Sequence, residues 1–205
     1  LEEGDAVRAL RINTLKVSDA AAKRLISSMG LVPLGYGSGY IFESAAPGSM
    51  PMHHAGAFYV QDPGAMSTVA AAESVISPDL RILDMCASPG GKSTQLAALL
   101  TNGGSGYLVS NEIDRSRAKI LRGNTERMGH RRTVVTSAAP DRIAEDFESF
   151  FDYVLVDAPC SGEGMMRKYA EASAQWSEEN VLMCAERQRG ILEAAQRCVC
   201  GGGYL

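Results

Sequence analysis

The sequence lacks several features that would place it outside the soluble globular proteins. No apolar run approaches the ~20 residues that are needed to span a bilayer, and the N-terminal LEEGDAV contains no apolar targeting segment. The five cysteines are an odd number without a secretory signal, which favours a reducing compartment over a disulfide framework. No CxxC or HxxxH pair is present, and this argues against structural zinc. We therefore expect a cytoplasmic protein without a membrane or metal role.

The sequence also lacks an excess of basic residues. Lysine and arginine total 20 against 24 aspartates and glutamates, which gives a net charge of −4. This balance argues against a protein that coats nucleic acid non-specifically, but it permits a local basic patch. The hydrophobic share of 45% and the charged share of 21% are typical of a globular chain. A length of 205 residues suffices for one domain with a smaller companion.

The N-terminal part of the chain predicts a small domain of its own. We expect a small α/β domain over residues 1–50 and a larger second domain over residues 51–205. Ser18 is suited to cap a helix that runs to Met29, and Gly30 is suited to end it. Short strands are expected at 7–15, 40–42 and 58–60.

Regular alternation of strands and helices follows from Asp79 onward. Before it, segment 45–56 is predicted to be a linker, and Pro63 is placed to open a helix that runs to about Val75. The expected strands are 81–85, 106–111, 132–136 and 152–157, and the expected helices are 92–101, 114–129, 140–146 and 177–197. This alternation predicts a parallel, doubly wound α/β sheet. The chain stops at 201–205, where a fifth strand is expected to begin, so we expect the last strands of such a sheet to be missing.

The segment CASPGGKST, residues 86–94, lies between an expected strand and an expected helix. Strand, glycine loop and helix together are the usual frame for a nucleotide-like cofactor. A phosphate-binding loop of the form GxxxxGK[ST] is disfavoured, because Cys86 stands where its first glycine would be. A nicotinamide dinucleotide is disfavoured as well, because GxGxxG fails when only Gly90 and Gly91 are present.

Glu112 ends the second of these strands and lies 21 residues after Gly91. An acid at this strand tip is placed to accept hydrogen bonds from a ribose diol. A glycine turn without a phosphate cradle, followed by such an acid, favours S-adenosylmethionine, which has a ribose and no phosphate. The alternative is that Glu112 caps the next helix beside Asp114, because acids are favoured at helix starts.

The fourth strand leads into DAPCSGEG, residues 157–164. Sites in open α/β sheets lie beyond the carboxyl ends of the strands, so Asp157 and Cys160 should emerge beside the glycine loop. A lone cysteine is more often a small buried hydrophobe. The proline before Cys160, and the acid three residues before it, favour a functional role.

With these motifs the sequence resembles the Sun (Nop2/Sun, or Fmu-like) family of RNA cytosine-5 methyltransferases, and especially its bacterial ribosomal-RNA branch. The resemblance rests on DMCASPGGKS at 84–93 and DAPCSGEGMMRK at 157–168. Flanking matches are LRINTLK at 10–16, FYVQDPGAM at 58–66, NEID at 111–114 and QWSEENVLMCAERQ at 175–188. These motifs extend over nearly the whole chain in the family's order, and DAPCSGEG is highly specific.

The resemblance implies a Rossmann-like, S-adenosylmethionine-dependent enzyme that methylates carbon 5 of cytosine in RNA, expected to be 16S ribosomal RNA. Carbon 5 is a poor nucleophile until a thiolate adds to carbon 6 and makes carbon 5 enamine-like. In the family two cysteines share this work. The cysteine of the Pro-Cys motif, here Cys160, helps product release, and the attacking cysteine lies in a later Thr-Cys motif.

No Thr-Cys motif occurs in these 205 residues. We therefore expect the chain to be a fragment that does not turn over alone. The alternative is a non-catalytic short paralogue that binds S-adenosylmethionine or RNA. A DNA cytosine methyltransferase would share the Pro-Cys logic, but the flanking motifs do not support one.

The resemblance also assigns individual site residues. Lys92 is expected to pair with Asp157 and orient it, although a helix-start lysine that faces solvent is the alternative. Asp157 is expected to hydrogen-bond the cytosine edge. The family's usual acid after the third strand is not in place, so Ser137 is the candidate for an adenine contact. The expected cofactor-binding residues are Cys86, Ala87, Ser88, Pro89, Gly90, Gly91, Lys92, Glu112, Ser137 and Asp157, and the expected catalytic residues are Cys160, Asp157 and Lys92.

RNA contacts are less well defined by the sequence. Arg167 and Lys168 lie beside the active loop and are expected to meet phosphate. His53 and His54 have no acid–base partner in view, and packing is more typical than base stacking for Trp176. We expect a monomer. Two other basic sets are more typical of solvated faces: Arg8, Arg11, Lys16, Lys23 and Arg24, and Arg127, His130, Arg131 and Arg132.

Overall fold

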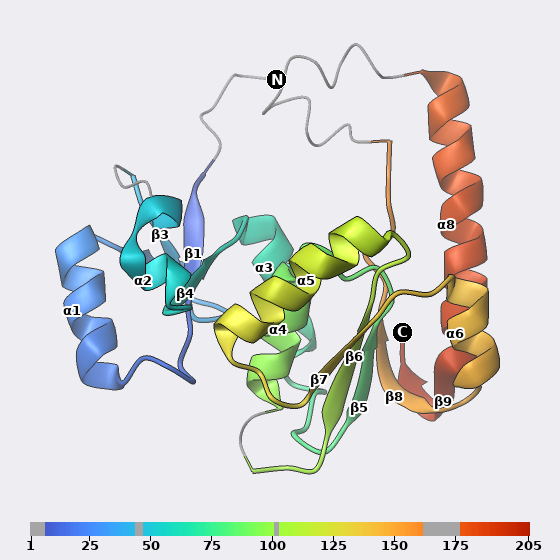
Figure 1. Cartoon of the computed structure of the whole chain (residues 1–205), viewed down its shortest axis with the longest axis horizontal. Coiled ribbons are helices and arrows are strands. Elements are labelled where there is room, and N and C mark those ends of the chain that lie inside the picture. Colours follow the sequence, from blue (N-terminus) through green and yellow to red (C-terminus); the bar gives the residue numbers. More distant parts are fainter. Residues whose placement is uncertain (1–6, 44–46, 101–102, 162–176) are drawn as a thin grey trace.

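The computed structural model describes residues 7–43, 47–100, 103–161 and 177–205. It contains two sheets, and the units built on them lie side by side, the N-terminal one at the left of Figure 1. The expected phosphate contacts Arg167 and Lys168 lie outside the described residues, and so does Trp176. Among the described helices, none is long and apolar enough to cross a membrane.

The N-terminal unit is a small antiparallel sheet covered by one helix. Its strands, in the order β2-β3-β1-β4, are β1 (Ala9–Ile12), β2 (Val32–Pro33), β3 (Gly39–Ile41) and β4 (Phe58–Val60). The helix α1 (Asp19–Met29) begins as predicted, where the Ser18 side chain accepts the N–H of Ala21, and Gly30 ends it with a left-handed φ of 60°. Leu10, Ile12 and Phe58 are at the centre of its core.

The linker predicted over 45–56 is wrong in its described part, which contains two helical turns. They are the 3₁₀ helix η1 (Pro47–Ser49) and α2 (Pro51–His54), and the proline at the start of each suits a first helical position. The domain boundary at residue 50 stays a prediction. Because β4 pairs antiparallel with β1, the first sheet continues to Val60, and we propose a boundary after that residue.

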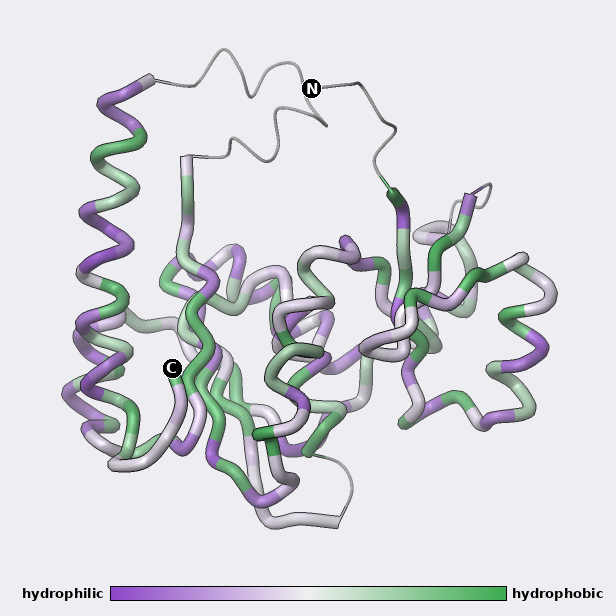
Figure 2. The backbone as a smooth tube through the Cα atoms, turned by 180° about the vertical axis from the view of Figure 1, so that it is seen from behind, coloured by the Kyte–Doolittle hydropathy of each residue, from purple (hydrophilic) through white to green (hydrophobic). Residues whose placement is uncertain are grey.

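The larger unit is the doubly wound sheet that the sequence predicts. All neighbouring strands are parallel, in the order β7-β6-β5-β8-β9. The strands are β5 (Arg81–Asp84), β6 (Tyr107–Asn111), β7 (Thr133–Thr136), β8 (Phe151–Leu155) and β9 (Val199–Tyr204). Figure 2 shows hydrophobic stretches along the central strands of this sheet. Since β5 and β8 lie inside the sheet, their apolar sequences are explained by burial on both faces.

Helices cover both faces of the larger sheet (Figure 1). They are α3 (Pro63–Ala72), α4 (Gly91–Leu99) and α5 (Arg115–Met128) on one face, and α6 (Pro140–Asp146) and α8 (Glu178–Cys198) on the other. In β5, Ile82 packs in one core cluster with Leu96 of α4. Its neighbour Leu83 packs in the other cluster with Ile143 of α6 and Ile191 of α8. Adjacent residues of this strand therefore pack against the helices on opposite faces of the sheet.

The prediction that Arg11 belongs to a solvated face is wrong, because this residue joins the two units. The residue is only 3% exposed. The guanidinium Nη2 donates to Thr94 Oγ1 at 2.7 Å and to the Gly91 carbonyl at 3.4 Å, and Nε donates to Gln61 Oε1 at 3.4 Å. Burial lowers the pKa of Arg11 to about 10. The first strand of the chain is thereby fixed to the start of α4.

A second set of contacts caps the carboxyl end of α5. Lys16 Nζ donates to the carbonyl of Arg127 at 2.7 Å and to that of Ala55 at 3.0 Å. Asn13 Nδ2 donates to the carbonyls of Met128 and Gly56, both at 2.8 Å. Carbonyls in the last turn of a helix have no hydrogen-bond donor inside the helix. Here the N-terminal unit supplies the donors.

Candidate functional site

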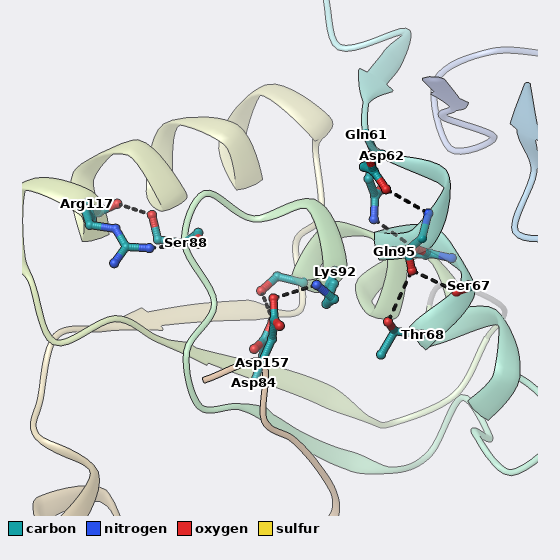
Figure 3. A network of polar contacts seen from close by, with 12 residues as sticks. Gln61, Asp62, Ser67, Thr68, Asp84, Ser88, Lys92, Gln95, Arg117 and Asp157 are labelled. Atoms are coloured by element: carbon teal, nitrogen blue, oxygen red, sulfur yellow. Dashed lines mark hydrogen bonds and ion pairs between the residues drawn. The ribbon is translucent and has the colours of Figure 1, made fainter. Parts of the chain in front are cut away.

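A cavity of about 220 Å³ lies at the junction of the two units, at the carboxyl ends of β5 and β8. One wall is β4 with the start of α3, and the other is the glycine loop with Asp157 (Figure 3). It brings together most of the expected site residues. Those that line it are Cys86, Ala87, Ser88, Pro89, Gly91, Lys92 and Asp157, and the further lining residues are Tyr59, Val60, Gln61, Asp62, Ala65 and Asp84.

The two glycines of the loop are required for different structural reasons. Gly90 has a φ of 110°, in the left-handed region that favours glycine. Gly91 has no such φ, but a Cβ placed on it would lie 3.3 Å from Cδ of Gln61, across the cavity. Gly90 therefore makes the turn, although it does not line the cavity, and Gly91 lets the two walls approach each other.

The predicted pairing of Lys92 with Asp157 is confirmed. Lys92 Nζ and Asp157 Oδ2 are 2.6 Å apart, and the two side chains meet beside Asp84 in Figure 3. The Lys92 side chain is 16% exposed, whereas that of Asp157 is 58% exposed. An ion pair this open to water contributes little stability. Its effect is to hold one carboxylate oxygen while the side chain stays accessible.

Asp84 is a site residue that the sequence reasoning missed. Its carboxyl group is buried, and Ser93 Oγ donates to Oδ2 at 2.6 Å. The other oxygen, Oδ1, is buried without a hydrogen-bond partner among the described residues. Burial raises the pKa of Asp84 to about 6. The clue in the sequence was its place at the end of the first strand of the sheet.

This pKa gives a pH-dependent stability. Because the folded-state pKa of about 6 lies above the ordinary 3.8, folding is favoured by the protonated form, and stability falls as the pH rises from about 4 to about 6. Two pKa units correspond to about 2–3 kcal/mol. We expect the unfolding free energy of Asp84→Asn, relative to the parent, to rise by that amount between pH 4 and pH 7 in urea titrations.

The control for this prediction is Asp152→Asn. Hydrogen bonds from Arg81 hold the pKa of Asp152 well below its usual range, so that carboxylate stabilises the fold above pH 4 and loses its effect as the pH falls. The relative stability of this variant should therefore change in the opposite direction at low pH. A constant difference between Asp84→Asn and the parent from pH 4 to pH 7 would contradict the prediction.

The two expected cysteines occupy different environments. Cys86 lines the cavity. The pKa of its thiol is raised to about 12, mainly by burial and to a smaller extent by the carboxylates of Asp84, Glu112 and Asp157. A protonated thiol is a poor nucleophile, so Cys86 is a wall residue. Cys160 is exposed on the segment after β8 and does not line the cavity.

Gln188 of α8 holds the segment that carries Cys160. Its Nε2 donates to the carbonyl of Pro159 at 3.0 Å. The residue lies in the matched segment QWSEENVLMCAERQ, to which the sequence reasoning gave no role. Gln188 therefore contacts the residue immediately before Cys160.

Glu112 and Ser137 lie outside the cavity lining. Glu112 is buried, accepts the N–H of Asp114 at 3.0 Å, and lies 3.4 Å from Arg117 Nη2. Asp114 is the N-cap of α5, so the capping role weighed for Glu112 belongs to its neighbour. Arg117 also donates to the Ser88 carbonyl at 3.2 Å, which links Glu112 to the glycine loop. The ribose role of Glu112 stays a prediction, as does the adenine role of Ser137, whose Oγ donates to the Ile113 carbonyl at 3.4 Å.

The wall from the N-terminal unit is the part of the site that the sequence did not reveal. Gln61 donates to Gln95 Oε1 at 3.3 Å, and the Tyr59 hydroxyl donates to the Pro89 carbonyl at 3.3 Å. Both residues belong to the matched segment FYVQDPGAM, which could have pointed to them.

Comparison with family models decides the family. The model described as 16S rRNA methyltransferase RsmB/F matches residues 75–205. The chain belongs to the RsmB/F family of 16S rRNA methyltransferases. The model for the N-terminal domain of 16S rRNA methyltransferase RsmF matches residues 2–63. All lining residues of the cavity except Ala65 therefore lie in segments that RsmB/F-family models match, and the resemblance to the Sun family is confirmed.

Individual relatives agree with this assignment to the RsmB/F family. Ribosomal RNA small subunit methyltransferase F of Escherichia coli is 37% identical over 97% of this chain, and that of Salmonella paratyphi B is 38% identical. The chain spans 43% of the length of these curated relatives. A solved methyltransferase homolog from Pyrococcus horikoshii has a TM-score of 0.81 at 26% identity and covers 98% of this chain, with 63% of its own length matched. NSun6 from the same organism shares the fold, with a TM-score of 0.79 at 19% identity over 97% of this chain and 75% of its own.

Proposed function

We propose that this chain is the S-adenosylmethionine-binding part of an enzyme that methylates carbon 5 of cytosine in RNA, with 16S ribosomal RNA as substrate. The observation that carries the proposal is the cavity between the glycine loop and β4, with the Lys92–Asp157 pair at its edge. We further propose that the protein acts in the cytoplasm as a monomer. Membership of the RsmB/F family supports the reaction class.

The residues present suit this methyl donor. S-adenosylmethionine carries a sulfonium and an ammonium group, and the cavity offers the carboxyl groups of Asp84 and Asp157. Asp84 Oδ1, which has no partner among the described residues, is an acceptor in the wall. A cavity of 220 Å³ is small beside the roughly 300–1,000 Å³ of ligand pockets. It therefore suits part of the donor, and Glu112 would hold the ribose.

Each remaining residue has a proposed task. The bound donor would supply an electrophilic methyl group. Asp157, held by Lys92, would accept a hydrogen bond from the cytosine edge. Cys160, on the segment that Gln188 supports, would act in product release. The 205 residues contain no Thr-Cys pair, so we propose that the attacking cysteine is not among them.

Calorimetric titration of S-adenosylmethionine tests this proposal. In Gly91→Arg the new side chain would start 3.3 Å from Gln61 and enter the cavity, so we expect affinity to fall at least 30-fold. Gly123→Arg adds the same side chain to an exposed site in α5 with no atom within 4 Å of the new Cβ, and it should bind as the parent does. Absence of binding by the parent chain, or equal binding by Gly91→Arg, would show that the cavity is not the donor site.

A further inference from the structure

Helix α5 is strongly basic in an acidic chain. It contains five basic residues and one acidic residue, Glu126, whereas the whole chain has a net charge of −4. Arg115, Lys119 and Arg122 follow one another at spacings of four and three, so they share one helical face, and all three are exposed. Charge alone is common on solvated helices. The surface at the carboxyl end of α5, however, also contains hollows and a buried polar side chain without a partner among the described residues.

Two hollows flank His130, which follows the carboxyl end of α5. The larger, of about 500 Å³, is lined by Lys16, Arg131 and Arg132 as well as by His130. The other, of about 320 Å³, lies towards Arg122 and also includes His130. Together they continue the basic face of α5 to Lys16 of the N-terminal unit.

His130 is an unpartnered polar side chain between these hollows. It is only 6% exposed, and neither ring nitrogen has a hydrogen-bond partner among the described residues. The neighbouring Thr133 Oγ1 is likewise buried without a partner. Buried polar atoms are normally hydrogen-bonded, so these atoms indicate a polar ligand. Burial, with the nearby cations of Arg11 and Lys16, lowers the pKa of His130 to about 4, so the ring is neutral and has one donor and one acceptor nitrogen.

Acidic groups near this surface are few and already engaged. Glu126 pairs with Arg122 at 2.7 Å, and Asp79, which lies near Arg132, accepts hydrogen bonds from Ser105. The Arg122–Glu126 pair is exposed and contributes little, so a phosphate can compete for the guanidinium. Arg131 and Arg132 are exposed, with no ion pair in the described part of the chain.

We propose that single-stranded RNA follows α5 from the glycine loop to the hollows beside His130, where the phosphates of one nucleotide lie on Arg131 and Arg132. Exposed arginines bind the phosphate backbone of single-stranded RNA. The track starts at the loop because Arg117, in the first turn of α5, donates to the Ser88 carbonyl. Fourteen helical residues span about 21 Å, the length of several extended nucleotides. Figure 1 shows α5 crossing the larger unit towards the N-terminal unit. The inference rests on the proposed function for the choice of RNA as ligand.

The test uses a fluorescent ten-nucleotide oligouridylate, which contains no cytosine, and fluorescence anisotropy with the 205-residue chain. The double variant Arg131→Glu/Arg132→Glu should weaken binding at least tenfold and lower the slope of log affinity against log salt by about 1–2. The control is Lys23→Glu/Arg24→Glu on the exposed surface of α1, which changes the net charge equally and should weaken binding less than threefold. Thermal melts establish that both variants are folded.

Three results would overturn the proposal: equal weakening by both double variants, no weakening by Arg131→Glu/Arg132→Glu, or no RNA binding by the parent chain. Its failure is separable from that of the proposed function, which calorimetry with the methyl donor tests at the other end of α5. Donor binding without an effect at Arg131 and Arg132 would remove only the RNA track. An effect at these arginines without donor binding would support the track and contradict the donor site.

Discussion

Arg11→Ala is expected to lower the free energy of unfolding by about 3–4 kcal/mol. The substitution removes the donors that bind Thr94 Oγ1, the Gly91 carbonyl and Gln61 Oε1, and it leaves a void between the two units. Buried acceptors that lose their donors cost more than exposed ones, because water does not replace the lost bond. Urea unfolding followed by circular dichroism measures this loss. The affinity for the methyl donor should fall too, since Gly91 starts the helix that borders the cavity.

The matched control is Arg8→Ala, in the segment just before the same strand. Arg8 is exposed, and its guanidinium lies 4.8 Å from the centre of the Phe42 ring. An exposed cation–π contact contributes about 0.5–1 kcal/mol, so the loss in this variant should stay well below that of Arg11→Ala. Similar losses at the two positions would mean that Arg11 does not hold the units together.

Gly56→Ala is expected to destabilise the protein by about 3–5 kcal/mol. Gly56 has a φ of 75°, where an L side chain is strained, and a Cβ at this position would overlap the backbone carbonyl of Arg127. The new Cβ is fixed by the backbone of residue 56, and it meets the backbone of Arg127. The overlap is therefore relieved only if the carboxyl end of α5 moves away from the N-terminal unit. The loss should appear in urea unfolding, together with earlier proteolysis between the two units.

The control for this variant is expected to change stability in the opposite direction. Gly123 lies inside α5 and no atom is within 4 Å of a Cβ built on it, so Gly123→Ala should stabilise the protein by about 0.5–1 kcal/mol. A neutral Gly56→Ala variant would show that the contact with Arg127 opens at little cost, and that the two units are loosely joined.

Most of the fold could be predicted from the sequence because its signals are local. The end residues Ser18 and Gly30 define α1, and the alternation after Asp79 defines the doubly wound sheet. Helical turns of three or four residues within 47–54 leave no periodic pattern, so the sequence predicted a linker there. The helix expected to run to Val75 ends at Ala72, where a turn follows.

The site was predictable only on one side. The glycine loop follows from a short motif next to a strand end, and the Lys92–Asp157 pair follows from the family resemblance. The opposite wall comes from β4, and no local pattern shows which distant strand will face a loop. Arg11 was misjudged for the same reason, because a charged residue in a short strand normally points to water. Its burial depends on a second unit whose position the sequence pattern does not contain.

Because the cavity has one wall in each unit, it forms late during synthesis of the protein. The N-terminal sheet is complete at Val60, whereas Gly91 and Thr94 are synthesised about thirty residues later. On a ribosome that adds about 5–20 residues per second, the first unit therefore waits for its partner for a few seconds. During that time Arg11 is hydrated, which gives the waiting surface a charge and disfavours its association with other nascent chains. Desolvation of Arg11 coincides with the docking of α4, so a chain still in synthesis acquires the cavity between its two units only at that step.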